Sequence, residues 1–220
     1  MTLGVVLTNY ARRENMPVIL ERLRAQSLET TIFVWDNSPA QDFDDPRVDW
    51  IVRSSRNARC AARWWMAAQA QTDFVLVHDD DLAPSDPAVL ADTLEGAARA
   101  APFAVGASGV ILAGHSYWKS EHVGVRARAI QADTAVDIVK GFYFCCPTAR
   151  LRTLGALNLD AEDDIAVSAW LSNDFQRPHR ILHRLQKRFS LLPEHGAARR
   201  RRRGHRAARD TARYRLFPRR

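Results

Sequence analysis

The feature that most constrains the fold is a short apolar run that ends in three consecutive acids. The run, FVLVHDDD at residues 74–81, has the length and boundaries of a buried strand. Adjacent carboxylates repel each other and resist burial unless a cation faces them. The stretch therefore predicts a buried strand whose end, at Asp79, Asp80 and Asp81, faces a cationic partner.

Strand-like and helix-like segments alternate through the first half of the chain. This alternation predicts a three-layer α/β domain around a mainly parallel sheet, which is a Rossmann-like α/β/α arrangement. Beyond Phe103 the pattern is weaker and fits antiparallel strands as well. The expected strands lie at residues 3–8, 31–35, 48–52, 74–77, 103–112, 123–129 and 138–145, and the expected helices lie at 16–23, 57–71, 87–100 and 164–172.

Polar residues follow three of the expected strands. They are Thr8 and Asn9, then Asp36 and Asn37, and then the three aspartates. Because ligands bind beyond the carboxyl ends of parallel strands, these clusters are expected along one edge of the domain.

The spacing of Asp79 and Asp81 suits a divalent cation. Mg²⁺ and Mn²⁺ prefer oxygen ligands, and one or two carboxylates with a diphosphate complete such a shell. The alternative is a solvated turn that leads into the helix near residue 87, with Asp86 as its N-cap.

Size and cysteine usage restrict the class of protein. The chain has 220 residues, of which 46% are hydrophobic, so it can form one large domain. It has no apolar run near the roughly 20 residues that span a bilayer. Three cysteines, two of them adjacent, do not fit a disulfide framework or a zinc site. We therefore expect a soluble protein of a reducing cytoplasm, in a bacterium or a virus-infected host.

The positive charge is concentrated at the C-terminal end. Residues 199–220 contain eleven arginines and one acid, Asp210. Because the whole chain has a net charge of +7 and this tail alone +10, residues 1–198 carry −3. We therefore expect a catalytic domain at 1–198 and a basic tail at 199–220. Such tails are commonly disordered arms that bind polyanions.

Several stretches resemble A-type (GT-A) glycosyltransferases, and in particular their exostosin-like branch. VLVHDDD resembles the DxD motif of these enzymes, which use a nucleotide-sugar and a divalent metal. Six further stretches follow the order of the branch, over nearly the whole chain. They are TNYARRENMPVILERL, FVWDN, RNARCAARW, KGFYFCCPTARLRTL, AEDDIAVSAWLS and GHRAARD.

The resemblance implies a role for each matching residue. Asp81 would be the direct metal ligand, with Asp79 as a further candidate from the spacing, and the metal would be Mn²⁺ or Mg²⁺. Asp79 and Asp80 would hold ribose and sugar hydroxyls. Arg59, one turn before Arg63, is expected on the same helix face. The donor-binding set would be Thr8, Asn9, Arg12, Asn37, Asn57, Arg63, Asp79, Asp80 and Arg206.

The second acidic element supplies the candidate catalytic residues. The resemblance places Asp163 or Asp164 beside the reacting carbon of the donor sugar, and spacing does not separate them from Glu162. From the residues alone, Asp163 could equally be a helix N-cap.

In the tail, the resemblance implies that Arg206 closes over the diphosphate, while residues 199–203 would contact the acceptor or the surface. A lone His205 is more often structural than a metal ligand.

These features predict a metal-dependent hexosyl- or N-acetylhexosaminyltransferase. It would move a sugar from a UDP-sugar to an acceptor hydroxyl, and the resemblance implies retention of configuration. The arginine-rich tail points to an anionic acceptor, such as hydroxymethylated phage DNA or an acidic glycan. The alternatives are a non-catalytic nucleic-acid-binding protein on the same scaffold and a sugar nucleotidyltransferase. The latter is disfavoured because no Gly-rich triphosphate loop lies near Thr8.

Overall fold

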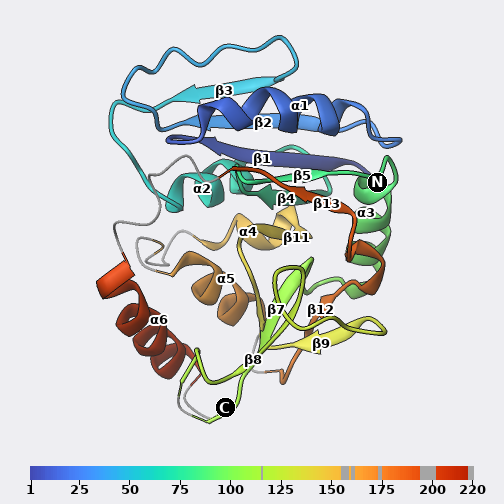
Figure 1. The fold of residues 1–220 in the computed structure, drawn as a ribbon, viewed down its shortest axis with the longest axis vertical. Helices are drawn as coiled ribbons and strands as arrows, with labels where there is room; N and C mark the ends of the chain where they lie inside the picture. The colour runs from blue at the N-terminus through green and yellow to red at the C-terminus, as the bar shows by residue number, and fades with distance from the viewer. Residues whose placement is uncertain (115, 155–158, 160–161, 173–174, 194–201, 218–220) are drawn as a thin grey trace.

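The central feature of the fold is a twisted sheet. The structure is a computed structural model that describes residues 1–220 except 115, 155–158, 160–161, 173–174, 194–201 and 218–220, with only the backbone described for 202–205. Within these residues, eight strands form this sheet in the order β3-β2-β1-β4-β11-β6-β12-β9 (Figure 1). Their bounds are β1 (Leu3–Asn9), β2 (Thr31–Asp36), β3 (Trp50–Arg53), β4 (Phe74–His78), β6 (Val105–Gly106), β9 (Thr134–Val136), β11 (Tyr143–Pro147) and β12 (His179–Ile181).

The N-terminal half of the sheet is parallel, as the sequence predicts. β1 lies between β2 and β4, and β3 pairs with β2, all in parallel. In this register Asn9 pairs with Asp36, and Leu7 pairs with His78. The polar residues that follow β1, β2 and β4 therefore share one edge of the sheet, which confirms the expected arrangement.

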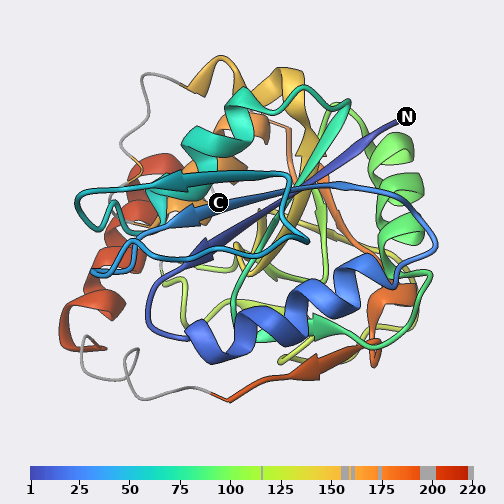
Figure 2. The same cartoon turned by 90° about the horizontal axis from the view of Figure 1, so that it is seen from above.

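Two hydrophobic cores lie on the two faces of the sheet. In β4, Leu76 packs with α1 (Met16–Arg24) and α3 (Val89–Ala100), whereas Val75 and Val77 pack with α2 (Ala61–Gln69) and α5 (Asp163–Ser172). Figure 2 shows α1 and α2 on opposite sides of the strands. This alternation produces the three-layer α/β/α architecture that the sequence predicts.

In the second half of the chain, two of the expected strands are each two shorter strands, because the chain leaves one sheet and joins another. The segment expected at 103–112 forms β6 and then β7 (Ser108–Ile111), and the one at 138–145 forms β10 (Ile138–Val139) and then β11. Among the described residues, a second sheet has the order β10-β7-β8. β8 (Glu121–Gly124) ends earlier than expected, because Gly124 turns the chain with a φ of 92° and Arg126 follows with a φ of 62°.

Two expected helix starts are wrong. α2 begins at Ala61, so Asn57 is not its N-cap, and its side chain instead accepts a hydrogen bond from the Arg59 amide. Arg59 has a φ of 52° and precedes the helix, so it does not share a helix face with Arg63. Asp86 likewise precedes α3 without capping it, and its carboxylate accepts a bond from the Ala88 amide at 2.8 Å.

The basic tail contains a helix. α6 (Arg202–Leu216) contacts α5, beside which it lies in Figure 1. Arg209, Arg213 and Phe217, spaced by four residues, are buried. A disordered arm is therefore the wrong description for residues 202–216.

The remaining elements are 3-10 helices at Arg13–Asn15 and His183–Leu185, α4 (Thr148–Leu151), β5 (Leu82–Pro84) and β13 (Phe189–Leu191).

Among the described residues, none of the helices combines the length and the apolar character that a bilayer crossing requires.

Leu76→Ala should destabilise the protein strongly, because Leu76 is fully buried in the strand that carries the aspartates. The expected loss in the free energy of unfolding is about 2–5 kcal/mol. The matched control is Leu191→Ala, since Leu191 is 59% exposed and should change stability by less than about 0.5 kcal/mol. Urea unfolding of both variants measures the difference, and equal losses would contradict the assignment of the core.

Candidate active site

A cavity of about 330 Å³ opens at the carboxyl ends of β1, β2 and β4. Seven of the predicted donor-binding residues line it, and Arg59 and Cys60 contribute as well. The full lining is Thr8, Tyr10, Ala11, Arg12, Asn37, Asn57, Arg59, Cys60, Arg63, Asp79 and Asp80. The structure therefore places the predicted residues from four separate segments around one volume.

Asn9 does not line the cavity but shapes its floor. It is fully buried, and its amide donates to Asp36 Oδ1 at 2.9 Å. Burial alone would raise the pKa of Asp36, but hydrogen bonds from Ser38, Phe43 and Asn9 hold that pKa below its ordinary value. Asp36 is therefore an ionised anchor for the loop after β2.

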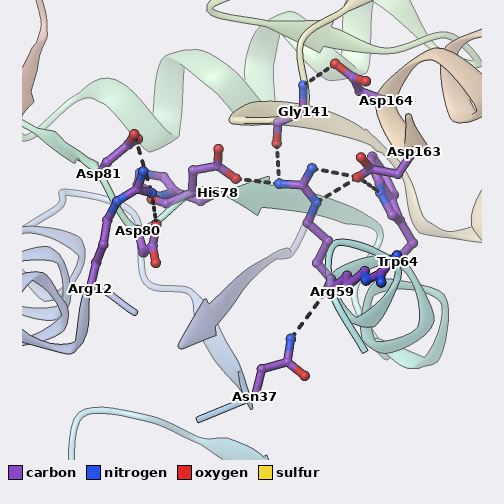
Figure 3. A network of polar contacts seen from close by, with 12 residues as sticks. Arg12, Asn37, Arg59, Trp64, His78, Asp80, Asp81, Gly141, Asp163 and Asp164 are labelled. Atoms are coloured by element: carbon purple, nitrogen blue, oxygen red, sulfur yellow. Dashed lines mark hydrogen bonds and ion pairs between the residues drawn. The ribbon is translucent and has the colours of Figure 1, made fainter. Parts of the chain in front are cut away.

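Asn37 joins two walls of the cavity. Its Oδ1 accepts from the Ala58 amide at 2.9 Å and from Trp35 Nε1 at 3.1 Å, and its Nδ2 donates to the Arg59 carbonyl at 3.2 Å. Figure 3 shows this last contact. Because Asn37 ties the end of β2 to the segment before α2, it fixes the width of the cavity between them.

Arg63 is the buried centre of the site. Its Nε and NH2 donate to Asp163 Oδ2 at 2.9 and 2.6 Å, and its NH1 donates to the Gly141 carbonyl at 3.0 Å and to Asp79. Trp64 Nε1 donates to the same oxygen of Asp163. Burial raises the pKa of Asp79 to about 7, against the opposing effect of Arg63. One guanidinium thus joins α2, the end of β4, α5 and the segment before β11.

The other two aspartates face different arginines. Arg12 NH1 lies 2.5 Å from Asp80 Oδ1 and 3.6 Å from Asp81 Oδ2. Arg126 NH2 lies 3.1 Å from Asp81 Oδ1 and also donates to the Asp81 carbonyl at 3.0 Å. Burial raises the pKa of Asp80, and Arg12 opposes that rise. The cationic partners that the three acids predict are therefore arginines of this chain.

Asp81 has the features that a metal ligand at this site needs. It is buried, and its Oδ1 has no hydrogen-bond donor despite the nearby Arg126. Asp79, the second predicted ligand, is held separately by Arg63. The described residues contain no group of three or more metal-binding side chains. A metal here would thus depend on Asp81 together with oxygens of a ligand, a mode that suits Mg²⁺ or Mn²⁺.

Asp164 is held by a residue that the sequence did not indicate. Arg209 NH2 donates to both carboxylate oxygens of Asp164 at 2.9 and 2.8 Å, and its NH1 donates to Glu162 at 2.7 Å. Arg209 also donates to the Tyr117 hydroxyl and lies 4.3 Å from the centre of that ring. Burial would raise the pKa of Asp164, but Arg209 keeps it below its ordinary value.

Arg206 does not line the cavity, and its role as a diphosphate clamp stays a prediction. It is exposed, and its guanidinium lies 5.5 Å from the ring centre of Trp118. The buried arginines of α6 are instead Arg209 and Arg213, and their four-residue spacing with Phe217 was the signal that could have found them. The side chain of His205 and residues 199–201 lie outside the described part of the chain.

Lys140 is a second residue that the sequence analysis missed. It lies between β10 and β11, directly before Gly141, whose amide donates to Asp164 Oδ2 at 3.3 Å. Burial and the nearby Arg209 lower the pKa of Lys140 to about 8. Lys140 therefore adds positive charge beside Asp164 and Arg209.

The fold matches known structures, although no family model and no curated protein matches the sequence. S. aureus TarS 1–349 with UDP-GlcNAc superposes with a TM-score of 0.60 at 14% identity, over 90% of this chain and 60% of that one. Mannosyltransferase PcManGT from Pyrobaculum calidifontis, in complex with GDP-Man and Mn²⁺, gives 0.57 at 14% identity, over 88% and 58%.

A longer TarS chain gives a TM-score of 0.57 at 16% identity, and this chain covers 37% of its length. The chain therefore spans between about a third and three-fifths of these proteins. The fold is that of the GT-A glycosyltransferases, as predicted. The narrower exostosin-like resemblance stays a prediction.

Arg63→Met should destabilise the protein by about 3–5 kcal/mol, because it leaves Asp163 buried without its cation. Arg13→Met is the matched control, since the ion pair of Arg13 with Asp42 is exposed and should contribute less than about 1 kcal/mol. Chemical denaturation measures both. Similar losses in the two variants would show that the buried pair does not hold the site together.

Lys140 should make stability rise with pH in the alkaline range. Between pH 8 and its ordinary pKa of 10.5, the unfolded chain keeps a proton that the folded protein has released. The free energy of unfolding therefore increases across this window. The test compares the wild-type protein with Lys140→Met by denaturation at several pH values without ligands. A wild-type protein that gains no stability relative to Lys140→Met from pH 8 to 10 would contradict the burial of the charged amine.

Proposed function

We propose that this protein is a metal-dependent glycosyltransferase that moves a sugar from a nucleotide-sugar, in the first instance a UDP-sugar, to an acceptor hydroxyl. The observation that carries the proposal is the cavity at the carboxyl ends of β1, β2 and β4, bordered by Arg12, Arg63, Asp79 and Asp80 on a GT-A fold. TarS with UDP-GlcNAc and PcManGT with GDP-Man and Mn²⁺ support a nucleotide-sugar as the ligand.

The nucleoside would occupy the part of the cavity lined by Thr8, Asn37 and Asn57. Asn37 has both amide groups engaged with the backbone, so it would act by holding the cavity wall and by van der Waals contact. Arg12 and Asp80 border the same volume, and a guanidinium is well suited to the oxygens of a diphosphate. Asp79 and Asp80 would accept hydrogen bonds from ribose and sugar hydroxyls.

Asp81 would hold the divalent cation, because its buried Oδ1 lacks a hydrogen-bond donor. When bound, Mn²⁺ or Mg²⁺ would neutralise the charge that develops on the diphosphate as the glycosidic bond breaks. Arg12 faces the same position from α1's side of the cavity and would stabilise the same charge. Arg126 would move its contact from Asp81 to an anionic ligand.

The transfer itself would rely on the carboxylate of Asp163 or of Asp164. The bond between the anomeric carbon and the diphosphate oxygen breaks, and a carboxylate nearby stabilises the oxocarbenium-like carbon. The acceptor oxygen then bonds to that carbon from the same face, and its proton goes to the departing phosphate oxygen. Asp163 is bound by Arg63 and Trp64 through one oxygen, and Asp164 is bound by Arg209 through both, so both predicted acids stay candidates for this role.

For the acceptor we retain an anionic polymer, such as hydroxymethylated DNA or an acidic glycan. The exposed Arg206 and Arg215 of α6 support a negatively charged partner. A non-catalytic nucleic-acid binder with this scaffold would bind polyanions and no nucleotide-sugar. A nucleotidyltransferase would consume a nucleoside triphosphate and a sugar phosphate.

The test is donor turnover with a panel of UDP- and GDP-sugars, with Mn²⁺ or with a chelator, reading the release of nucleoside diphosphate. We expect metal-dependent release from one donor and a loss of at least about 100-fold in Asp81→Asn, since the variant removes the anionic ligand. Asp42→Asn is the control, because Asp42 is exposed and pairs only with Arg13 among the described residues.

Three outcomes would contradict the proposal. Chelator-resistant release would exclude the role of Asp81. Binding of DNA without metal-dependent binding of UDP or GDP would favour the nucleic-acid binder. Consumption of a nucleoside triphosphate with a sugar phosphate would favour the nucleotidyltransferase.

A further inference from the structure

Lys140 carries a positive charge that the protein does not neutralise. Within the described part of the chain its amine takes part in no ion pair, although the side chain is half-buried. The choice of lysine is itself unusual here, because only three of the 32 lysine and arginine residues of the chain are lysines. Lysine presents a compact charge with freely rotating donors, whereas arginine presents a rigid planar fork.

The neighbours of Lys140 place it inside the site. Its own amide donates to the Ser108 carbonyl at 2.8 Å, which fixes the backbone. Through Gly141 it adjoins Asp164, and through Phe142 it adjoins Arg126, whose guanidinium lies 5.2 Å from the centre of that ring. Lys140 therefore lies on the segment that connects the aspartate of α5 with the arginine that faces Asp81.

The surrounding acids are already paired with arginines. Asp81 contacts Arg126, and Asp164 contacts Arg209 at two oxygens. Burial first, and then repulsion by the guanidiniums of Arg209 and Arg126, lower the pKa of Lys140, and Asp164 only partly opposes them. A half-buried cation between two others is unfavourable in the free protein, and it becomes favourable when an anion enters.

We propose that Lys140 is an anion-binding residue of the active site, whose amine holds a phosphate oxygen of a ligand between Arg126 and Arg209. This inference rests on the proposed function, because that function supplies the ligand. The phosphate has two possible sources: the diphosphate that leaves the donor sugar, or a phosphate carried by the acceptor. Both present the same charged oxygen to the amine, and the experiment separates them.

The first arm measures binding of UDP and of uridine by calorimetry in the presence of Mn²⁺. Lys140→Met should weaken UDP binding roughly 10- to 100-fold, as expected for a lost charge-assisted hydrogen bond. Uridine, which has no phosphate, should bind both proteins equally. Lys140→Arg should retain part of the affinity, because the charge stays. Lys119→Met is the matched control, since Lys119 is exposed.

The second arm titrates sulfate, as a phosphate probe, into the protein already saturated with UDP and Mn²⁺. Sulfate binding that Lys140→Met abolishes, with UDP binding unchanged, would assign the amine to the acceptor's phosphate. Thermal unfolding without ligands serves as the folding control. Lys140→Met should unfold at the wild-type temperature or above it, because it removes an unpaired charge.

The outcomes distinguish this inference from the proposed function. Unchanged affinity of Lys140→Met for both UDP and sulfate, with a wild-type protein that binds UDP, would overturn the role of Lys140 alone. A wild-type protein that binds neither UDP nor GDP would overturn the proposed function, and the inference would fail with it.

Discussion

The geometry of the site depends on the burial of one guanidinium. Arg63 contacts Asp163, Asp79 and the Gly141 carbonyl, so it joins a helix, a strand end, a second helix and a loop that are up to 100 residues apart in sequence. A buried charge of this kind is tolerated only when its partners surround it. The contacts of Arg63 therefore fix the positions of these four elements relative to one another. The shape of the cavity beside them depends on those positions.

Pairs of an acid and an arginine from different elements recur across the site. Each acid faces an arginine from another element: Asp80 faces Arg12, Asp81 faces Arg126, and Asp164 faces Arg209. Arginine remains protonated at any ordinary pH, so each of these carboxylates has a charged partner that orients it before a ligand arrives. Such preorganised charges cost little rearrangement when charge develops on a substrate. Lys140, without an acid of its own, is the exception to this pairing.

The sequence predicted the part of the site that local patterns encode. The apolar run at 74–77 and the polar residues after each strand were sufficient to place the aspartates, Thr8 and Asn37 at one sheet edge. The partners of the acids were not predictable from local patterns. The passage of the chain between the two sheets places Arg126 and Lys140 at the site, and the packing of α6 against α5 places Arg209 there. In the tail, the match of His205-Arg206 to a motif pointed to an arginine that is exposed, whereas the packing of α6 depends on the spacing of Arg209, Arg213 and Phe217.

The contact between Arg209 and Asp164 links the ionisation of one side chain to the position of a whole helix. A carboxyl as buried as Asp164 keeps its proton when its principal cation is withdrawn. By reciprocity, protonation of Asp164 weakens the attachment of α6, and detachment of α6 removes the negative charge from Asp164. The cavity at the carboxyl ends of β1, β2 and β4 is lined by other segments of the chain. The charge of Asp164 and the walls of that cavity therefore depend on separate segments.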